Sequence, residues 1–312
     1  MTLIYVCATF CAPIWGAPAT PDGVLNSLQG DVSVNGLPVR AFDAGKARLE
    51  VGGSIQTGEG MAEMLLTPGA FLRLGNRSVL NLEAAGPTDV RAKLTQGEAL
   101  IEVVDLQAGL VVEQNGAIAV IRKPGLYDFN AKRARIDVYA GEAELKTDRS
   151  RAVAGKGVGI KAHDLREFKA APNPGSALLA WSNLRSEQLS RESWASAAEA
   201  SSDAAKPNSA GPAWYWNPWS ASYTFLSASG FVTGPFGWPY YSPCYAPNAI
   251  PTHRGGDSYL YGLPVLGNQG PANPVETPGV VRPPTVPLTA PGVPQFPNNR
   301  FNSNPRGGFG NP

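Results

Sequence analysis

The feature that most constrains the fold of this chain is a two-residue alternation of apolar and polar side chains that repeats from Gly23 to Ala162. Short alternating runs end at Gly, Pro or Asn, and two of them end at Asn35-Gly36 and Asn115-Gly116, dipeptides that favour two-residue hairpin turns. Turn signals recur about every 8–12 residues, which is typical of sandwiches, jelly rolls and barrels. A 3.6-residue period does not persist here for the length of a helix. We therefore predict an all-β fold over residues 23–165, an antiparallel sandwich or jelly-roll-like domain.

The alternation also predicts which side chains share a face of each strand, because successive side chains of a strand point to opposite faces. The expected same-face sets are Val32 and Val34; Val90, Ala92 and Leu94; Ala99, Ile101 and Val103; Tyr127 and Phe129; Ala134, Ile136 and Val138; and Ala143 and Leu145.

A change of pattern after Asn173-Pro174 predicts one helix over residues 176–204. Ser176 can cap its first turn, and Leu178, Trp181 and Leu184 recur at three-residue spacing. We expect this Leu/Trp side to pack on the β domain or on a partner.

Residues 205–262 comprise a Ser/Ala/Lys/Pro linker and an aromatic block that is interrupted by proline and glycine. Prolines at short intervals exclude a long helix or a central strand there. Two interpretations stand side by side: the rings contact a partner, or the block folds back and covers an open edge or face of the β domain. The candidate contact residues are Trp214, Trp216, Trp219, Trp238, Tyr240 and Tyr241.

The two ends of the chain differ from this middle part. Residues 1–19 resemble a signal peptide, an apolar run too short to span a bilayer with Ala17-Pro18-Ala19 as the cleavage site, although a buried first strand is the alternative. Cleavage would leave Cys244 as the one cysteine of the mature chain. Residues 263–312 are rich in Pro, Gly and Asn, and we expect them to be disordered. We expect an exported protein, periplasmic or on the cell surface, with no transmembrane span in the mature chain.

Composition and motifs give little support for catalysis. The formal net charge of +1 provides no long-range field to attract nucleic acid. The two histidines, His163 and His253, lie far apart, no G-x-S-x-G motif is present, and a multi-thiolate metal site is excluded. Carboxylates such as Glu98, Glu102 and Asp105 leave a glycosidase as a remote alternative. We expect no enzyme activity and no catalytic residue, cofactor or metal site.

Several motifs of the β region together resemble the FecR family, periplasmic sensory domains first associated with ferric-citrate regulation. They include the I-x-T-G-x-G sequence that ends at Gly60 and two later G-x-A elements. The matching stretches are 30–36, 52–60, 64–74, 94–100 and 138–143, and the resemblance as a whole covers about half of the chain. The aromatic extension, with Trp216-Asn217-Pro218 and Pro235-Phe236-Gly237-Trp238, is similar to that of some envelope proteins of this family.

Regulators of that family carry a cytoplasmic anti-sigma segment and a membrane helix before the sensory domain, and neither pattern is found here. The resemblance therefore implies a stand-alone binding or scaffold module of the bacterial cell envelope, with an unidentified envelope protein or polymer as partner. A structural envelope protein with a spacer tail, or an uncharacterised carbohydrate-active enzyme, are the alternatives.

Overall fold

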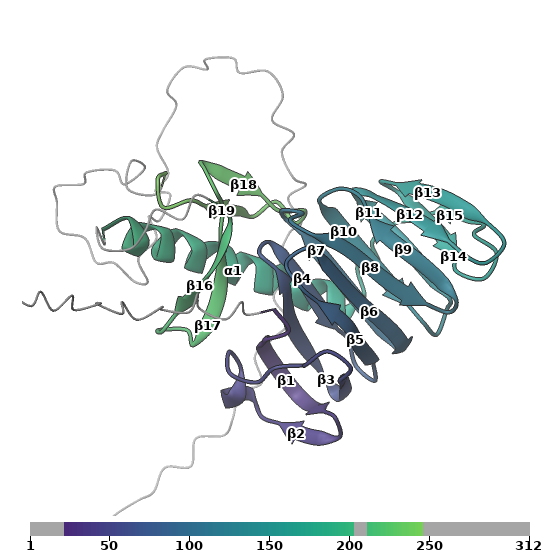
Figure 1. The fold of residues 1–312 in the computed structure, drawn as a ribbon, viewed down its shortest axis with the longest axis horizontal. Coiled ribbons are helices and arrows are strands. Elements are labelled where there is room, and N and C mark those ends of the chain that lie inside the picture. The colour runs from purple at the N-terminus through teal and green to yellow at the C-terminus, as the bar shows by residue number, and fades with distance from the viewer. Residues whose placement is uncertain (1–21, 203–210, 246–312) are drawn as a thin grey trace, which may run out of the picture. The chain divides into compact units, whose positions relative to one another are not determined.

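A computed structural model describes residues 22–202 and 211–245 of the chain (Figure 1). The expected signal peptide, 1–19, and the expected disordered tail, 263–312, lie outside the described residues, as do parts of the 205–262 segment. Within the described ranges the protein is mostly β-sheet with one long helix, which confirms the predicted all-β class.

The strands before the helix are β1 (Leu25–Val34), β2 (Leu37–Val39), β3 (Ser54–Thr67), β4 (Ala70–Leu74), β5 (Val79–Ala85), β6 (Asp89–Gln96), β7 (Glu98–Val103), β8 (Gly109–Gln114), β9 (Ala117–Ile121), β10 (Gly125–Asn130), β11 (Arg135–Ala140), β12 (Glu142–Lys146), β13 (Arg151–Gly155), β14 (Val158–Lys161) and β15 (Glu167–Lys169), with the 3-10 turn η1 (Ala41–Asp43). The helix α1 (Ala177–Ser202) follows, and then β16 (Ala213–Asn217), β17 (Ser222–Leu226), β18 (Phe231–Thr233) and β19 (Pro239–Tyr241).

The first fifteen strands form one curled sheet in the order β13-β12-β9-β8-β6-β5-β3-β4-β7-β10-β11-β14-β15 (Figure 1). β1 pairs with β3 beside this path, and β2 pairs with β1. β3 joins the two halves of this order: its start pairs with β5 and its end with β4. The halves enclose a shared apolar core, as a sandwich does, and the core contains side chains from both, such as Leu94 of β6 and Ile101 of β7.

The sheet is mixed, because β6 and β8 run parallel while its other pairs are antiparallel. The chain passes from β6 to β7 in the other half of the sheet and then returns to β8, which pairs with β6. The predicted sandwich-like core is present, but its strands belong to one continuous sheet.

Most of the predicted core faces are buried, including Val90, Ala92 and Leu94 on β6 and Tyr127 and Phe129 on β10. Ala134 differs from the expectation. It lies before β11 in a turn, with a φ of 46°, and is half-buried. The local alternation predicted which face Ala134 shares with Ile136 and Val138. It did not predict that β11 begins only after Ala134.

A single glycine makes each of two crossings between the halves, Gly97 between β6 and β7 and Gly141 between β11 and β12. Both have positive φ, and these are the glycines of the two G-x-A elements. A Cβ on Gly97 would lie 2.5 Å from the Cα of Ser78, and one on Gly141 would lie 2.1 Å from the Tyr127 hydroxyl. The crossings therefore require glycine for conformation and for space.

Gly97→Ala is expected to destabilise the domain more than Gly157→Ala. The two glycines share a φ of 81°, but a Cβ on Gly157 would meet no atom within 4 Å. Gly157→Ala should lower the free energy of unfolding only by the strain of the left-handed conformation, roughly 1–2 kcal/mol. Urea denaturation of the two variants measures the difference, and equal losses would show that Gly97 is not sterically confined.

Candidate functional site

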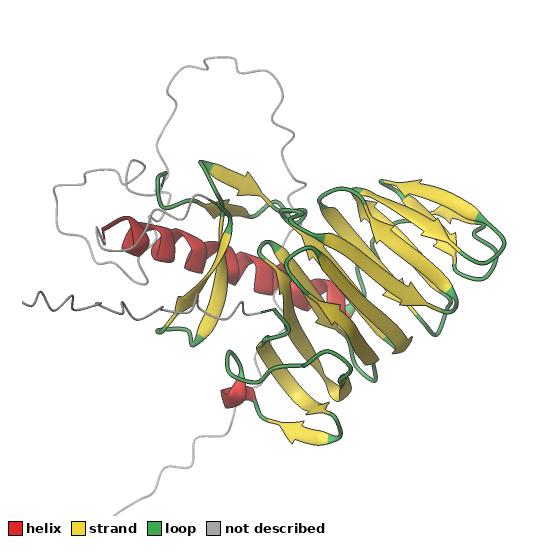
Figure 2. Ribbon diagram, viewed as in Figure 1, coloured by secondary structure: helices red, strands yellow, loops and turns green. Residues whose placement is uncertain are grey.

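The aromatic block forms two hairpins that pack on α1 and on the sheet. β16 pairs with β17, and β18 pairs with β19. The helix covers the outer face of β4 and β7, and the hairpins lie along the helix (Figures 1 and 2). Two interpretations of this block were given above. The one in which the block folds back on the β domain applies to much of it.

Serine side chains line the face of α1 that receives the hairpins. Ser193 donates its hydroxyl to the Phe225 carbonyl at 2.8 Å and accepts the Tyr241 amide at 2.9 Å. Ser190 donates to the Pro239 carbonyl at 2.5 Å. These short side chains let strand backbones approach the helix and satisfy their polar groups.

The buried face of α1 differs from the expected Leu/Trp side. Leu178 is buried and Trp181 is half-buried, but Leu184 is 64% exposed. A three-residue spacing drifts around a helix of 3.6 residues per turn, so the third residue leaves the face that the first one occupies. The buried face continues instead through Ser186 and Leu189.

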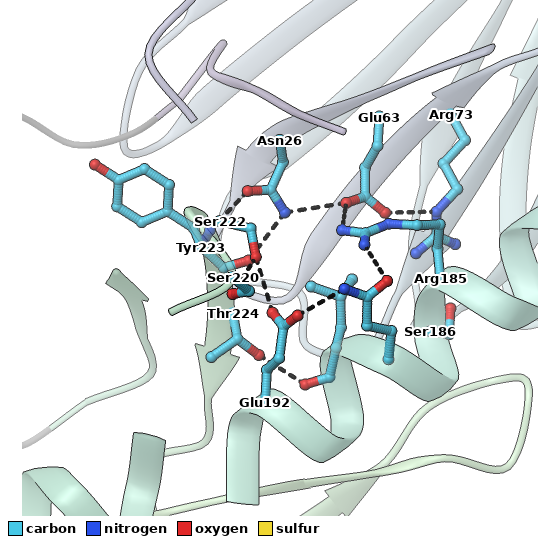
Figure 3. A network of polar contacts seen from close by, with 12 residues as sticks. Asn26, Glu63, Arg73, Arg185, Ser186, Glu192, Ser220, Ser222, Tyr223 and Thr224 are labelled. Atoms are coloured by element: carbon cyan, nitrogen blue, oxygen red, sulfur yellow. Dashed lines mark hydrogen bonds and ion pairs between the residues drawn. The ribbon is translucent and has the colours of Figure 1, made fainter. Parts of the chain in front are cut away.

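A buried network of charges joins α1 to the outer face of β3, β4 and β7. Figure 3 shows the part of it around Glu63. The Arg73 guanidinium donates to Glu63 at 2.8 Å through Nε and to Glu102 at 2.7 Å through Nη1. Arg185 of α1 reaches Glu63 at 2.8 Å, and Ser186 donates to Glu102. Two carboxylates thus face two guanidiniums, which neutralises the charges that burial would otherwise strongly disfavour.

The pKa values of the two carboxyls reflect how many guanidiniums each one contacts. Burial alone would raise the pKa of Glu63, but Arg185 and Arg73 together hold it at about 2. Burial raises the pKa of Glu102, and its one guanidinium, Arg73, offsets this only in part.

Polar contacts continue this network to the first aromatic hairpin. The side chain of Asn26 donates to Glu63 at 3.0 Å and makes two hydrogen bonds with the backbone of Tyr223, at 2.7 and 2.9 Å. Ser222 donates to Glu192 of α1 at 2.9 Å (Figure 3). We call the whole network the polar seam; its residues are Asn26, Glu63, Arg73, Glu102, Arg185, Ser186, Glu192 and Ser222.

An apolar cluster lies next to the polar seam and completes the attachment of the hairpins. Phe71 of β4 and Phe225 of β17 are fully buried in it, together with Tyr240 of β19. The ring of Phe71 lies 6.1 Å from that of Tyr240 and 5.1 Å from that of Trp214. Aromatic contacts of this kind add to the stabilisation that burial gives.

The buried or half-buried rings of four of the six candidate contact residues make contacts within the molecule. Tyr240 is fully buried, and Trp214 is half-buried against Phe71. Trp216 is half-buried against Tyr223, with ring centres 5.0 Å apart. Trp238 donates its indole N–H to Asn183 of α1 at 2.9 Å. In this structure these rings mainly hold the hairpins in place.

The other two candidates mark the surface that the block presents. Trp219, in the turn between β16 and β17, is 91% exposed. Tyr241 stacks on Tyr245, with ring centres 6.1 Å apart, and both rings contact Phe231. Phe231 is 51% exposed and Tyr245 is 37% exposed, and both were missing from the sequence-based set. Tyr241 itself is half-buried and also packs on Trp194 of α1, with ring centres 4.9 Å apart. We call Trp219, Phe231 and Tyr245 the exposed aromatic set.

Residues 22–202 and 211–245 contain neither a metal-ligand cluster nor a helix able to cross a membrane. No group of three or more His, Cys, Asp or Glu side chains is placed to hold a metal ion there. Among the helices of the same ranges, none combines the length and the apolar character that crossing a membrane requires.

Comparisons with known proteins give no family for the chain. No family model matches it, and no curated protein matches it. It is similar to two crystal structures of a candidate anti-sigma factor from Parabacteroides distasonis ATCC 8503, solved at 1.65 and 2.50 Å. The identities are 14% and 15%, the TM-score is 0.34 for both, and each match covers 42% of this chain and 64% of the other, less than two thirds of its length. A likeness of this size assigns neither fold nor function.

Proposed function

We propose that this chain is an exported, FecR-like, non-catalytic module of the bacterial cell envelope that binds a protein partner through the exposed aromatic set. The observation that carries the proposal is the exposure of large rings on hairpins that are otherwise firmly packed. Trp219 is 91% exposed, although the strands on both sides of its turn pair in register from Ala213 to Leu226.

These rings lie on hairpins whose backbone is fixed, and this favours binding. A ring on a fixed hairpin loses little conformational freedom when a partner covers it, so more of the burial free energy contributes to affinity. Trp and Tyr are also the residue types that most often dominate protein interfaces.

The absence of catalysis is part of the proposal. The buried carboxylates Glu63 and Glu102 contact guanidiniums and have no exposed surface, so a substrate would have no access to them. Glu98, which the sequence offered together with Glu102 and Asp105, lines a pocket that includes neither Glu63 nor Glu102.

Substituting Trp219, Phe231 and Tyr245 together by Ser is expected to weaken partner binding at least about 30-fold, the effect of losing one or more interface hot spots. The partner is first identified by photo-crosslinking from position 219 in envelope extract, and its dissociation constant is then measured with purified proteins. The thermal midpoint should change little, because these rings are substantially exposed.

The matched control substitutes Leu37, Val51 and Val153 by Ser, three exposed apolar residues on the β domain. This control should bind like the wild type. Equal binding by the aromatic variant would contradict the proposal and favour a spacer role. Retention of the chain on purified peptidoglycan, with no protein crosslinked, would contradict a protein partner.

A further inference from the structure

Strand β13 forms one end of the curled sheet, and among the described residues it pairs with β12 alone (Figure 1). It is five residues long, Arg151–Gly155. The other terminal strands, β2 and β15, have three residues each; β2 contains Pro38, and two of the three residues of β15 are charged. Short, charged and proline-containing edge strands resist pairing with another chain. The edge of β13 is therefore the least protected of the three.

The hydrogen bonds of the β12–β13 hairpin determine which backbone groups of β13 face outward. The Thr147 amide donates to the Ser150 carbonyl at 2.9 Å, so this pair closes the hairpin. Hydrogen-bonded pairs of an antiparallel ladder alternate with non-hydrogen-bonded pairs, so every second residue from Ser150 faces β12. The residues between them, Arg151, Val153 and Gly155, therefore direct their amide and carbonyl groups away from β12.

The side chains of these three residues lie on the outer face of the sheet, where two of them are exposed. Val153, at the centre of the strand, is 60% exposed. Arg151 lies opposite Lys146, a like charge, and forms no ion pair among the described residues. The carboxylate nearest in charge to it, Glu144, is already paired with Arg122. The edge thus presents an exposed apolar side chain and a cation without a close counter-charge.

Gly155 leaves an open passage on the same face. It does not have positive φ, and a Cβ there would meet no atom within 4 Å. Neither the conformation nor the packing of its own chain therefore requires glycine at this position. Its neighbour on β12 is Glu142, whose side chain is 34% exposed and pairs with Lys123. A side chain that crosses Gly155 from outside the sheet would reach Glu142.

We propose that two copies of this chain pair antiparallel along β13, with the two-fold axis at Val153. Val153 then lies opposite itself, and Arg151 lies opposite Gly155 of the second copy. Each opposed pair exchanges the backbone hydrogen bonds that the free edge offers, and two sheets become one. The Arg151 side chain passes over the glycine toward Glu142 of the second copy.

A second copy is favoured over an unrelated strand because the edge complements itself. A large cation and an open passage to a carboxylate lie two residues from Val153 in opposite directions, so each matches the other only when β13 opposes β13. An interface with two-fold symmetry requires this property. Strand β13 contains no member of the exposed aromatic set, so the inference is independent of the partner proposed above.

Sedimentation velocity of the full chain between about 1 and 500 µM tests the dimer. Pairing of one short edge buries a small area, so the dimer should be weak, and the mass should rise with concentration from one chain toward two. Val153→Lys should weaken the association at least about tenfold, because two lysines would oppose each other at the axis. Its urea midpoint should stay close to that of the wild type, since Val153 is largely exposed.

Leu37→Lys is the matched control, because it adds the same charge on β2, where Leu37 is 71% exposed. This control should associate like the wild type. Partner binding per chain should be unchanged in both variants, since neither substitution touches the exposed aromatic set.

An exchange of charges tests the register. Arg151→Glu should weaken the dimer at least about threefold, because it places a carboxylate beside Glu142 of the second copy. Adding Glu142→Arg to this variant should restore the association. Within one chain Glu142 lies opposite Gly155, four residues or about 13 Å along the strand from Arg151, so the recovery reports a contact between copies.

The mass of a single chain at every concentration would overturn the proposal. A dimer that Val153→Lys leaves unchanged would also overturn it, because the contact would then lie elsewhere. If Arg151→Glu dissociates the dimer and Glu142→Arg does not restore it, the antiparallel pairing about Val153 is wrong.

Discussion

Replacing Arg73 by Met is expected to lower the free energy of unfolding by about 3–5 kcal/mol, because it leaves buried carboxylates without their shared cation. Glu63 would retain Arg185, but Glu102 would retain only the Ser186 hydroxyl among its present hydrogen-bond partners. Urea denaturation followed by circular dichroism measures the loss.

Arg77→Met is the matched control, since Arg77 forms an exposed ion pair with Glu59. Exposed pairs contribute about 0–1 kcal/mol, so this variant should remain close to the wild type. If Arg73→Met and Arg77→Met have the same small effect, Arg73 is not buried in a paired network.

Phe225→Ala is expected to cost about 3–5 kcal/mol, the usual effect of removing a large ring from a packed interior. Phe225 is fully buried, and its ring lies 5.7 Å from that of Tyr240 and 6.2 Å from that of Trp214. The effect should be visible in the denaturation midpoint and in a loss of near-ultraviolet circular dichroism from the surrounding rings.

Trp219→Ala provides the comparison within the same hairpin. Trp219 is highly exposed, so its removal should change the stability by no more than about 0.5 kcal/mol. A small effect for both variants would mean that segment 211–245 is not packed on the domain.

These two predictions also determine how the function should be tested. Deleting the chain after residue 204 would remove Phe225 and Tyr240 and would uncover Phe71 and Leu65 on the sheet. Loss of binding by such a truncated chain would then report damage to the fold as much as loss of a contact surface. Substitutions confined to exposed rings avoid this problem.

The parts of the fold that depend on neighbouring residues could be predicted from the sequence. Asn35-Gly36 and Asn115-Gly116 form the expected turns, and all four residues have positive φ. Val90, Ala92 and Leu94 are buried together because side chains of a strand alternate between two faces.

The polar seam could not be predicted, because its burial depends on residues far apart in the sequence. Arg73 and Glu102 occupy the outer positions of strands, where charged side chains normally contact water. They are buried because α1 covers this face, and Arg185 meets Glu63 across 122 residues of sequence. The one local signal was that apolar residues fill both faces of β4 around Arg73.

The aromatic block shows the same limit at the level of single rings. Composition identified a stretch rich in Trp and Tyr, but register and packing decide which rings are exposed. Trp214 lies opposite Phe225 in the hairpin and turns toward the sheet, whereas Trp219 lies in the turn. Tyr240 and Tyr241 are adjacent in the sequence, but only Tyr240 is fully buried.

Hydrogen–deuterium exchange of the full chain tests most directly whether the aromatic hairpins are an integral part of the domain. The backbone amides of β17, residues 222–226, should exchange with the same opening free energy as those of β4, residues 70–74, because the polar seam and the cluster around Phe225 couple the two elements. Rapid exchange of β17 while β4 remains protected would contradict this account.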